Sequence, residues 1–130
     1  QGFENYKRWQ EDNRIQVMKQ EMEMVSEVYR FGGCPDALGI DSRSNFCILD
    51  WKTSSSGPYI DWLLQLAAYK ILWSENHPSE QITGGFHLLK FGKENADFSH
   101  FHWQDLHEAE EYFLLLVQAY ALDKKLKKRL

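Results

Sequence analysis

Cysteine and long apolar runs are scarce in this 130-residue chain, and each scarcity excludes a class of protein. The two cysteines, Cys34 and Cys47, are too few for a disulfide framework, a zinc ribbon or a four-thiolate iron–sulfur cluster, so we expect both to be reduced in a cytoplasmic protein. The longest apolar stretch, residues 62–73, is interrupted by Gln65 and Lys70. Because a membrane span needs roughly 18 to 20 apolar residues, we expect no membrane partner.

An excess of basic charge is also missing. The 15 Lys and Arg residues are outnumbered by 19 Asp and Glu residues, which gives a net charge of −4. This balance argues against a general basic surface for nucleic acid, but it is compatible with a carboxylate-rich metal site, where bound cations offset the charge. The 43% of hydrophobic residues is enough for a core, so we expect one domain over residues 1–130. Because the first residue is Gln rather than Met, we expect a trimmed chain that lacks N-terminal residues.

The spacing of apolar residues and turn residues predicts alternating helices and strands. The predicted elements are a helix at 3–13, an extended segment at 15–24, a strand at 25–40 with a bulge or a close backbone approach at Gly32-Gly33, a strand at 46–52, a helix at 59–74, a hairpin of 82–91 and 97–103 that turns at 92–95, and a helix at 105–122. This order predicts an α/β fold with a mixed β-sheet flanked by α-helices.

The strand at 46–52 carries the first chemically informative pattern. Asp50 and Lys52 are two residues apart, so their side chains point to the same face of the sheet. Cys47, Leu49 and Trp51 point to the opposite face, into a core. A buried carboxylate and ammonium cost several kcal/mol per ion unless they are paired, so this pair is expected to have a function.

Asp36 follows Pro35 at the end of the preceding predicted strand. If the two strands pair as a hairpin, Asp36 approaches Asp50, and two neighbouring carboxylates repel unless a cation lies between them. Hard oxygen ligands of this kind suit Mg²⁺ or Mn²⁺. The pattern therefore predicts a divalent-metal site, where Lys52 is placed to orient a water molecule or to neutralise charge on a phosphodiester.

Three short motifs in this order resemble a known nuclease signature. They are Gly33-Cys34-Pro35-Asp36, Asp50-Trp51-Lys52-Thr53 and Gln65-Leu66-Ala67-Ala68-Tyr69. Together they resemble the PD-(D/E)XK nuclease superfamily, and within it the RecB-like and phage-type exonuclease branch, over about residues 15–75. The resemblance implies a restriction-endonuclease-like fold and metal-dependent hydrolysis of phosphodiester bonds.

The same resemblance implies a role for each matching residue. It makes Asp36 and Asp50 metal ligands, with the backbone carbonyl of Trp51 as a further ligand. It makes Lys52 the catalytic lysine and implies Mg²⁺ or Mn²⁺ as the cofactor.

The helix at 59–74 is expected to face this site with its polar side chains. The resemblance places Gln65 and Tyr69 at the site, and Asp61, Gln65 and Tyr69 are four residues apart and so share one helical face. A buried glutamine needs a hydrogen-bonding partner in any case, and a backbone group is the alternative to the site.

An upstream acidic or histidine residue is also typical of the family that these motifs resemble. Glu21, fifteen residues before Asp36, is the candidate as a catalytic residue and metal ligand. Glu23 and Glu27 compete for the role, and on a strand all three would share one face.

The sequence thus predicts an Mg²⁺- or Mn²⁺-dependent deoxyribonuclease, an exonuclease acting on duplex ends or single strands. An oligomer or a larger recombination or repair complex is expected, in a bacterial or phage-infected cell, with the nucleus or mitochondrion as alternative compartments. The alternative functions are a structure- or sequence-specific endonuclease and a nonenzymatic nucleic-acid-binding or assembly domain. The intact Asp36, Asp50 and Lys52 favour an enzyme.

Three further features leave their roles open. His87, His100 and His102 have no neighbouring Cys or carboxylate to complete a zinc set, so we expect a polar hairpin face. The loop at 53–57 is equally suited to contact a phosphate or to be a plain surface loop. The basic tail at 123–130 fits either a nucleic-acid backbone or a solvated helix end.

Overall fold

The computed structural model describes residues 2–92 and 98–130. Within these ranges the elements are, in order, α1 (Gly2–Asn13), β1 (Gln16–Gln20), β2 (Met24–Ser26), β3 (Phe31–Gly33), β4 (Ala37–Ile40), β5 (Phe46–Thr53), α2 (Ile60–Asn76), β6 (Ile82–Phe91), β7 (Phe98–Trp103) and α3 (His107–Lys127). Five strands form one sheet in the order β1-β4-β5-β6-β7, while β2 and β3 form a separate hairpin. Only β5 and β6 pair in parallel, because α2 connects them as a crossover.

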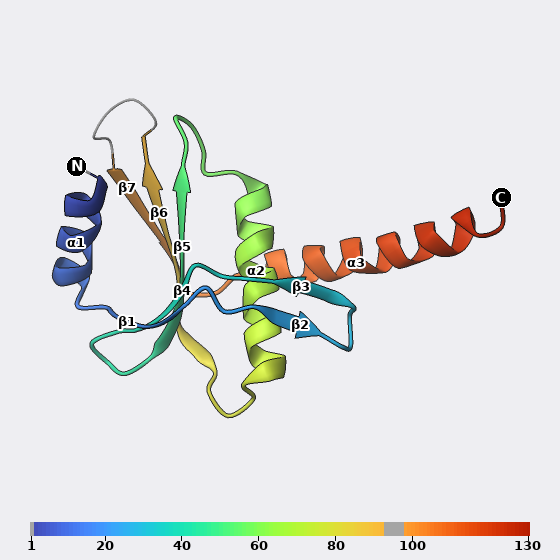
Figure 1. Cartoon of the computed structure of the whole chain (residues 1–130), viewed down its shortest axis with the longest axis horizontal. Helices are drawn as coiled ribbons and strands as arrows, with labels where there is room; N and C mark the ends of the chain where they lie inside the picture. Colours follow the sequence, from blue (N-terminus) through green and yellow to red (C-terminus); the bar gives the residue numbers. More distant parts are fainter. Residues whose placement is uncertain (1, 93–97) are drawn as a thin grey trace.

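The sheet separates two apolar clusters. Figure 1 shows α1 and α2 on opposite sides of the sheet. Leu66 and Leu72 of α2 pack with Ile48 and Leu88 on one face, and Trp9 of α1 covers the other face. The chain is therefore a mixed α/β fold in three layers.

The predicted alternation along β5 is confirmed. Cys47 and Leu49 are buried in the cluster beneath α1, while Ile48 is buried in the cluster beneath α2. Trp51 is half-buried on the α1 side, where its ring lies 5.7 Å from that of Tyr6. Asp50 and Lys52 consequently project from the face that α2 covers.

The prediction of a single strand over residues 25–40 was wrong. The chain turns after Ser26, whose hydroxyl accepts a hydrogen bond from the Tyr29 amide and donates one to Glu75. The backbone N–H of Arg30, at φ 63°, donates to the Ser26 carbonyl at 3.0 Å and closes the turn. Gly33 lies in β3 rather than in a bulge, and a Cβ there would lie 3.1 Å from Leu72, so the expected close backbone approach is present.

The C-terminal elements differ from prediction mainly in length. Strands β6 and β7 pair antiparallel as predicted, and their turn at residues 92–95 lies largely outside the described residues. Helix α3 runs on to Lys127, five residues beyond its predicted end, so the basic tail is largely helical. None of the described helices is long and apolar enough to cross a membrane.

Gly85→Ala is expected to lower the free energy of unfolding by about 2 kcal/mol or more. Gly85 has φ +82°, and a Cβ there would lie 2.4 Å from the Trp103 carbonyl oxygen. Urea unfolding measures the effect. The matched control is Gly32→Ala, where the nearest atom would be 3.2 Å away and the strand conformation is ordinary. Equal losses in the two variants would contradict the argument from backbone conformation.

Candidate active site

The antiparallel pairing of β4 and β5 brings the two predicted carboxylates together. Ala37 pairs with Leu49, so Asp36 lies across from Asp50 at the next position. The Trp51 backbone N–H donates to Asp36 Oδ2 at 3.0 Å, and the two carboxyl groups are close enough to share a hydrogen bond. The hairpin arrangement expected from sequence is therefore present.

Asp50 lies in an environment that disfavours its charge. Its side chain is 3% exposed. Burial, followed by the hydrogen bond and the charge of Asp36, raises the pKa of Asp50 from 3.8 to about 7, while Lys52 acts in the opposite direction. In the metal-free protein this carboxyl group therefore holds its proton through most of the acidic range.

Lys52 bridges the strand and the helix. Its Nζ lies 3.0 Å from Asp50 Oδ2 and donates a hydrogen bond to Gln65 Oε1. The approach to Asp50 is an ion pair without hydrogen-bonding geometry, so among the described residues the buried Oδ2 has a charged neighbour but no donor. Gln65 thus finds its polar partner at this site rather than at a backbone group.

Tyr69 lies one turn after Gln65 on α2 and is buried. Burial, together with the charges of Asp50 and Asp36, raises the pKa of the Tyr69 phenol, and a hydrogen bond with Gln65 lowers it. The phenol is therefore neutral and close to the carboxylates. Asp61, one turn before Gln65, is exposed, so the polar face of α2 meets the site only through its later members.

The prediction that Glu21, Glu23 and Glu27 share a strand face was wrong. β1 ends at Gln20, Glu21 adopts φ +50°, and Glu27 lies in the turn after β2. Glu21 is nevertheless adjacent to the site, because its backbone N–H donates to the Asp36 carbonyl at 3.1 Å.

The upstream glutamates act together on an exposed cysteine at the edge of the site. Partial desolvation, then the charges of Glu23, Glu21 and Asp36, raise the pKa of the Cys34 thiol. The strip beside Asp36 is therefore rich in negative charge. The role of Glu21 as a ligand remains a prediction.

A divalent cation fits the carboxylate pair. Within residues 2–92 and 98–130, no three His, Cys, Asp or Glu side chains are gathered into a ready metal cage. Mg²⁺ commonly uses one or two protein carboxylates and completes its shell with water and substrate phosphate, so two suffice. Asp50 Oδ2 is buried beside Asp36 and accepts no hydrogen bond from the described residues, so it is an oxygen that such a cation would coordinate. The Trp51 amide is bound to Asp36, and its carbonyl remains a predicted ligand only.

Lys90 belongs to none of the sequence motifs, but it lies beside the site. In the parallel ladder Lys90 of β6 pairs with Lys52 of β5, so both side chains share one face. Lys90 is the only charged residue in β6. That isolated charge was the available signal, but only the register between β5 and β6 shows which residue it accompanies.

The three histidines lie together on one face of the β6–β7 hairpin, as expected, but α1 covers part of that face. His87 is buried, and its ring stacks on those of His100 and His102 at centroid distances of 5.1 and 4.4 Å. Trp9 of α1 covers His87 and His100, since the apolar side of that helix needs burial. Burial, then the neighbouring histidines, lowers the pKa of His87 to about 3, so His87 is a neutral part of the core, while His102 at the other side of the cluster is exposed.

Comparison with known proteins places this geometry in a fold class. No family profile matches the sequence, and no curated protein matches it. Among solved structures, a protein of Eubacterium rectale named "putative exonuclease" is similar, with a TM-score of 0.52 and 16% sequence identity. The similarity covers 78% of this chain and 41% of the Eubacterium protein. SSO0001 is similar with a TM-score of 0.48 and 17% identity over 90% and 57% of the two chains. The chain spans less than half of the Eubacterium protein, and the likeness to it concerns the fold. The five-stranded mixed sheet flanked by helices is consistent with a restriction-endonuclease-like fold, as the sequence predicted.

Proposed function

We propose that this chain is a divalent-metal-dependent deoxyribonuclease of the PD-(D/E)XK superfamily, from the RecB-like and phage-type branch, acting on DNA ends or single strands. The observation that carries the proposal is the pairing of Asp36 with the buried Asp50, with Lys52 held against Asp50. The exonuclease name of the Eubacterium protein supports the same activity.

Asp36 and Asp50 are the residues that would hold Mg²⁺ or Mn²⁺. The cation would supply Lewis-acid polarisation of a phosphodiester oxygen. Lys52 is fixed by Asp50 and Gln65, so its positive charge is oriented before substrate arrives and can stabilise negative charge that develops on the phosphate. Tyr69, neutral and buried, adds a phenol beside the two carboxylates.

Cleavage of labelled DNA tests the activity. The protein is incubated with end-labelled single-stranded DNA, duplex DNA and RNA in Mn²⁺, in Mg²⁺ or in a chelator. We expect metal-dependent loss of DNA with a ladder that starts at one end. Discrete internal cuts would instead favour an endonuclease, and retention without cleavage would favour a binding domain. Cleavage that continues in the chelator would contradict the metal site.

Lys90→Ala is expected to raise the KM for DNA about 3- to 10-fold while kcat changes less. Lys90 lies on the face of Lys52, where its charge would meet the phosphate backbone rather than the reacting atoms. When KM is measured over a range of salt concentrations, the slope of log KM against log salt concentration should be smaller by about 1 for this variant than for the wild type. Lys7→Ala, an exposed lysine on α1, is the control. An equal effect of Lys7→Ala would show that total charge, not position, matters.

A further inference from the structure

Helix α3 carries an apolar stripe on the side that faces away from α2. Five residues form this stripe, spaced three and four apart: Tyr112, Leu115, Ala119, Leu122 and Leu126. The exposed fractions of Tyr112, Leu115, Leu122 and Leu126 are 49, 58, 54 and 64%. Alternating spacings of three and four along a helix are typical of the seam of a coiled coil.

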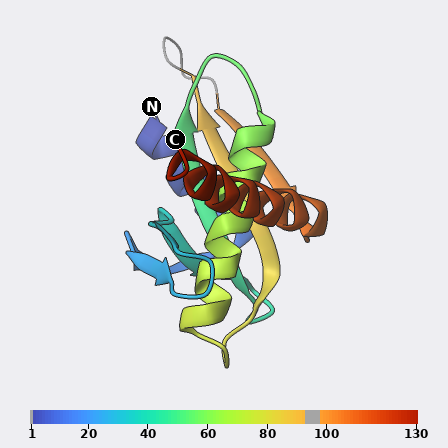
Figure 2. The same ribbon diagram turned by 90° about the vertical axis from the view of Figure 1, so that its right-hand side faces the viewer.

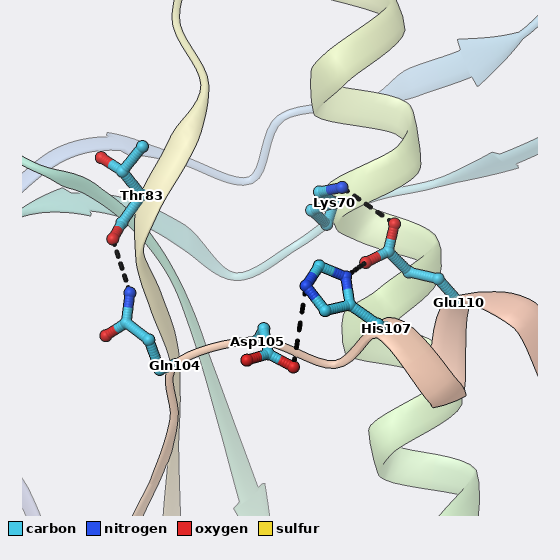
Figure 3. A network of polar contacts seen from close by, with 6 residues as sticks. All are labelled: Lys70, Thr83, Gln104, Asp105, His107 and Glu110. Carbon is cyan, nitrogen blue, oxygen red and sulfur yellow. Dashed lines mark hydrogen bonds and ion pairs between the residues drawn. The ribbon is translucent and has the colours of Figure 1, made fainter.

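Within the part of the chain that the structure describes, the polar and aromatic contacts of α3 with the body come from its first half. Glu110 accepts from Lys70 Nζ at 2.9 Å and lies beside His107 (Figure 3). The ring of Phe113 contacts that of Phe31 at 4.8 Å. These contacts are on the side of α3 opposite the stripe. Figures 1 and 2 show that the helix crosses α2 and then projects from the fold.

The projecting helix lacks the burial that usually stabilises a helix. None of the described α3 residues is buried, although α3 is the longest helix at 21 residues. In water a helix gains most of its stability from packing of an apolar face rather than from propensity. The stripe therefore needs a partner surface of matching shape.

The charges of α3 identify that partner. Glu108 and Glu111 lie in the first turns, and Lys124, Lys125 and Lys127 lie in the last turn. A second α3 laid antiparallel on the stripe would bring the acidic turns of each helix against the basic turns of the other, with Glu111 beside Lys125. A parallel arrangement would place like charges together.

We propose that two copies of this chain pair through the α3 stripe, antiparallel about an axis near Gln118. Because the body contacts lie opposite the stripe, the two folds lie on opposite sides of the helix pair and do not collide. Each dimer then presents two separate copies of the candidate active site. The pairing stands independently of the nuclease proposal.

Molar mass in solution tests the dimer. Light scattering and sedimentation over a range of protein concentrations should give twice 15.4 kDa for the wild type. Leu115→Glu with Leu122→Glu should raise the dissociation constant at least about 100-fold and return the mass to that of one chain. The matched control is Met18→Glu, an equally exposed apolar residue on β1, which should leave the dimer intact. Circular dichroism confirms that each variant is folded.

Charge reversal tests the antiparallel orientation. Glu111→Lys and Lys125→Glu should each weaken the dimer about 10-fold, and the double variant should restore it. A wild type that stays monomeric at every concentration would overturn the proposal, as would a dimer unaffected by the stripe variant. A stripe that binds only a different protein would show as a wild-type monomer and overturn it as well. Failure of the charge rescue would overturn the antiparallel arrangement.

Discussion

Asp50→Asn is expected to abolish metal-dependent cleavage and, in the metal-free protein, to raise the melting temperature. Cleavage should fall about 1,000-fold or more, because the variant loses one of two carboxylates that would hold the cation. The gain in stability has a separate cause. The asparagine side chain would keep the shape of the aspartate but carry no charge in a site that is 3% exposed.

The sign of the stability effect follows from the pKa of Asp50. The folded state raises this pKa from 3.8 to about 7, so it holds the proton more tightly than the unfolded chain does. The free energy of unfolding of the wild type therefore falls as the pH rises from about 4 to about 7. Above pH 7 the ionised Asp50 exerts its full destabilising effect. The shift corresponds to a cost on the order of 2 to 4 kcal/mol, which the variant would avoid.

The difference between the two proteins is the quantity to measure. Thermal unfolding is followed in a chelator at pH 5 and pH 8. The variant should have the higher melting temperature, and the difference should be larger at pH 8, on the order of 5 to 10 °C. The melting temperatures of the two proteins are subtracted at each pH, because the lowered pKa of His87 makes both proteins less stable toward acid. Added Mn²⁺ should stabilise the wild type and not the variant. An advantage independent of pH would contradict the assigned charge environment.

The strongest sequence predictions were those in which a local pattern determined the environment. The period of two along β5 was enough to place Cys47 and Leu49 on one side and Asp50 with Lys52 on the other. The spacing of Gln65 and Tyr69 was enough to direct them to one helical face. Such predictions succeed because strand and helix geometry alone decides which side chains share a surface.

The failures concern features that depend on distant segments. The hairpin of β2 and β3 is held by a hydrogen bond from Ser26 to Glu75, forty-nine residues away. The sequence around Ser26 does not predict this contact. The position of Lys90 beside Lys52 requires the β5–β6 register. The burial of His87 requires α1 to pack on the sheet, and hairpin periodicity alone gave no sign of that cover.

Lys52→Met is expected to reduce kcat about 1,000-fold or more while DNA binding in Ca²⁺ is largely retained. Methionine keeps the length of the stem but removes the charge that Asp50 and Gln65 hold in place. The variant should also destabilise the metal-free protein, but only where Asp50 is ionised. Because Lys52 lowers the pKa of Asp50, its loss raises that pKa further, so the cost should be small at pH 5 and about 1 to 2 kcal/mol at pH 8.

A double-mutant cycle separates this ion pair from general effects of the substitution. Asp50→Asn, Lys52→Met and the double variant are compared by urea unfolding at pH 5 and pH 8, with Lys70→Met as the control for loss of a partly exposed lysine paired elsewhere. The Asp50–Lys52 coupling should appear at pH 8 and largely vanish at pH 5, where the carboxyl group is protonated. Lys70→Met should leave cleavage unchanged, because its partner Glu110 lies on α3. Equal coupling at both pH values would mean that Asp50 keeps its charge throughout, and full activity of Lys52→Met would remove this lysine from the site.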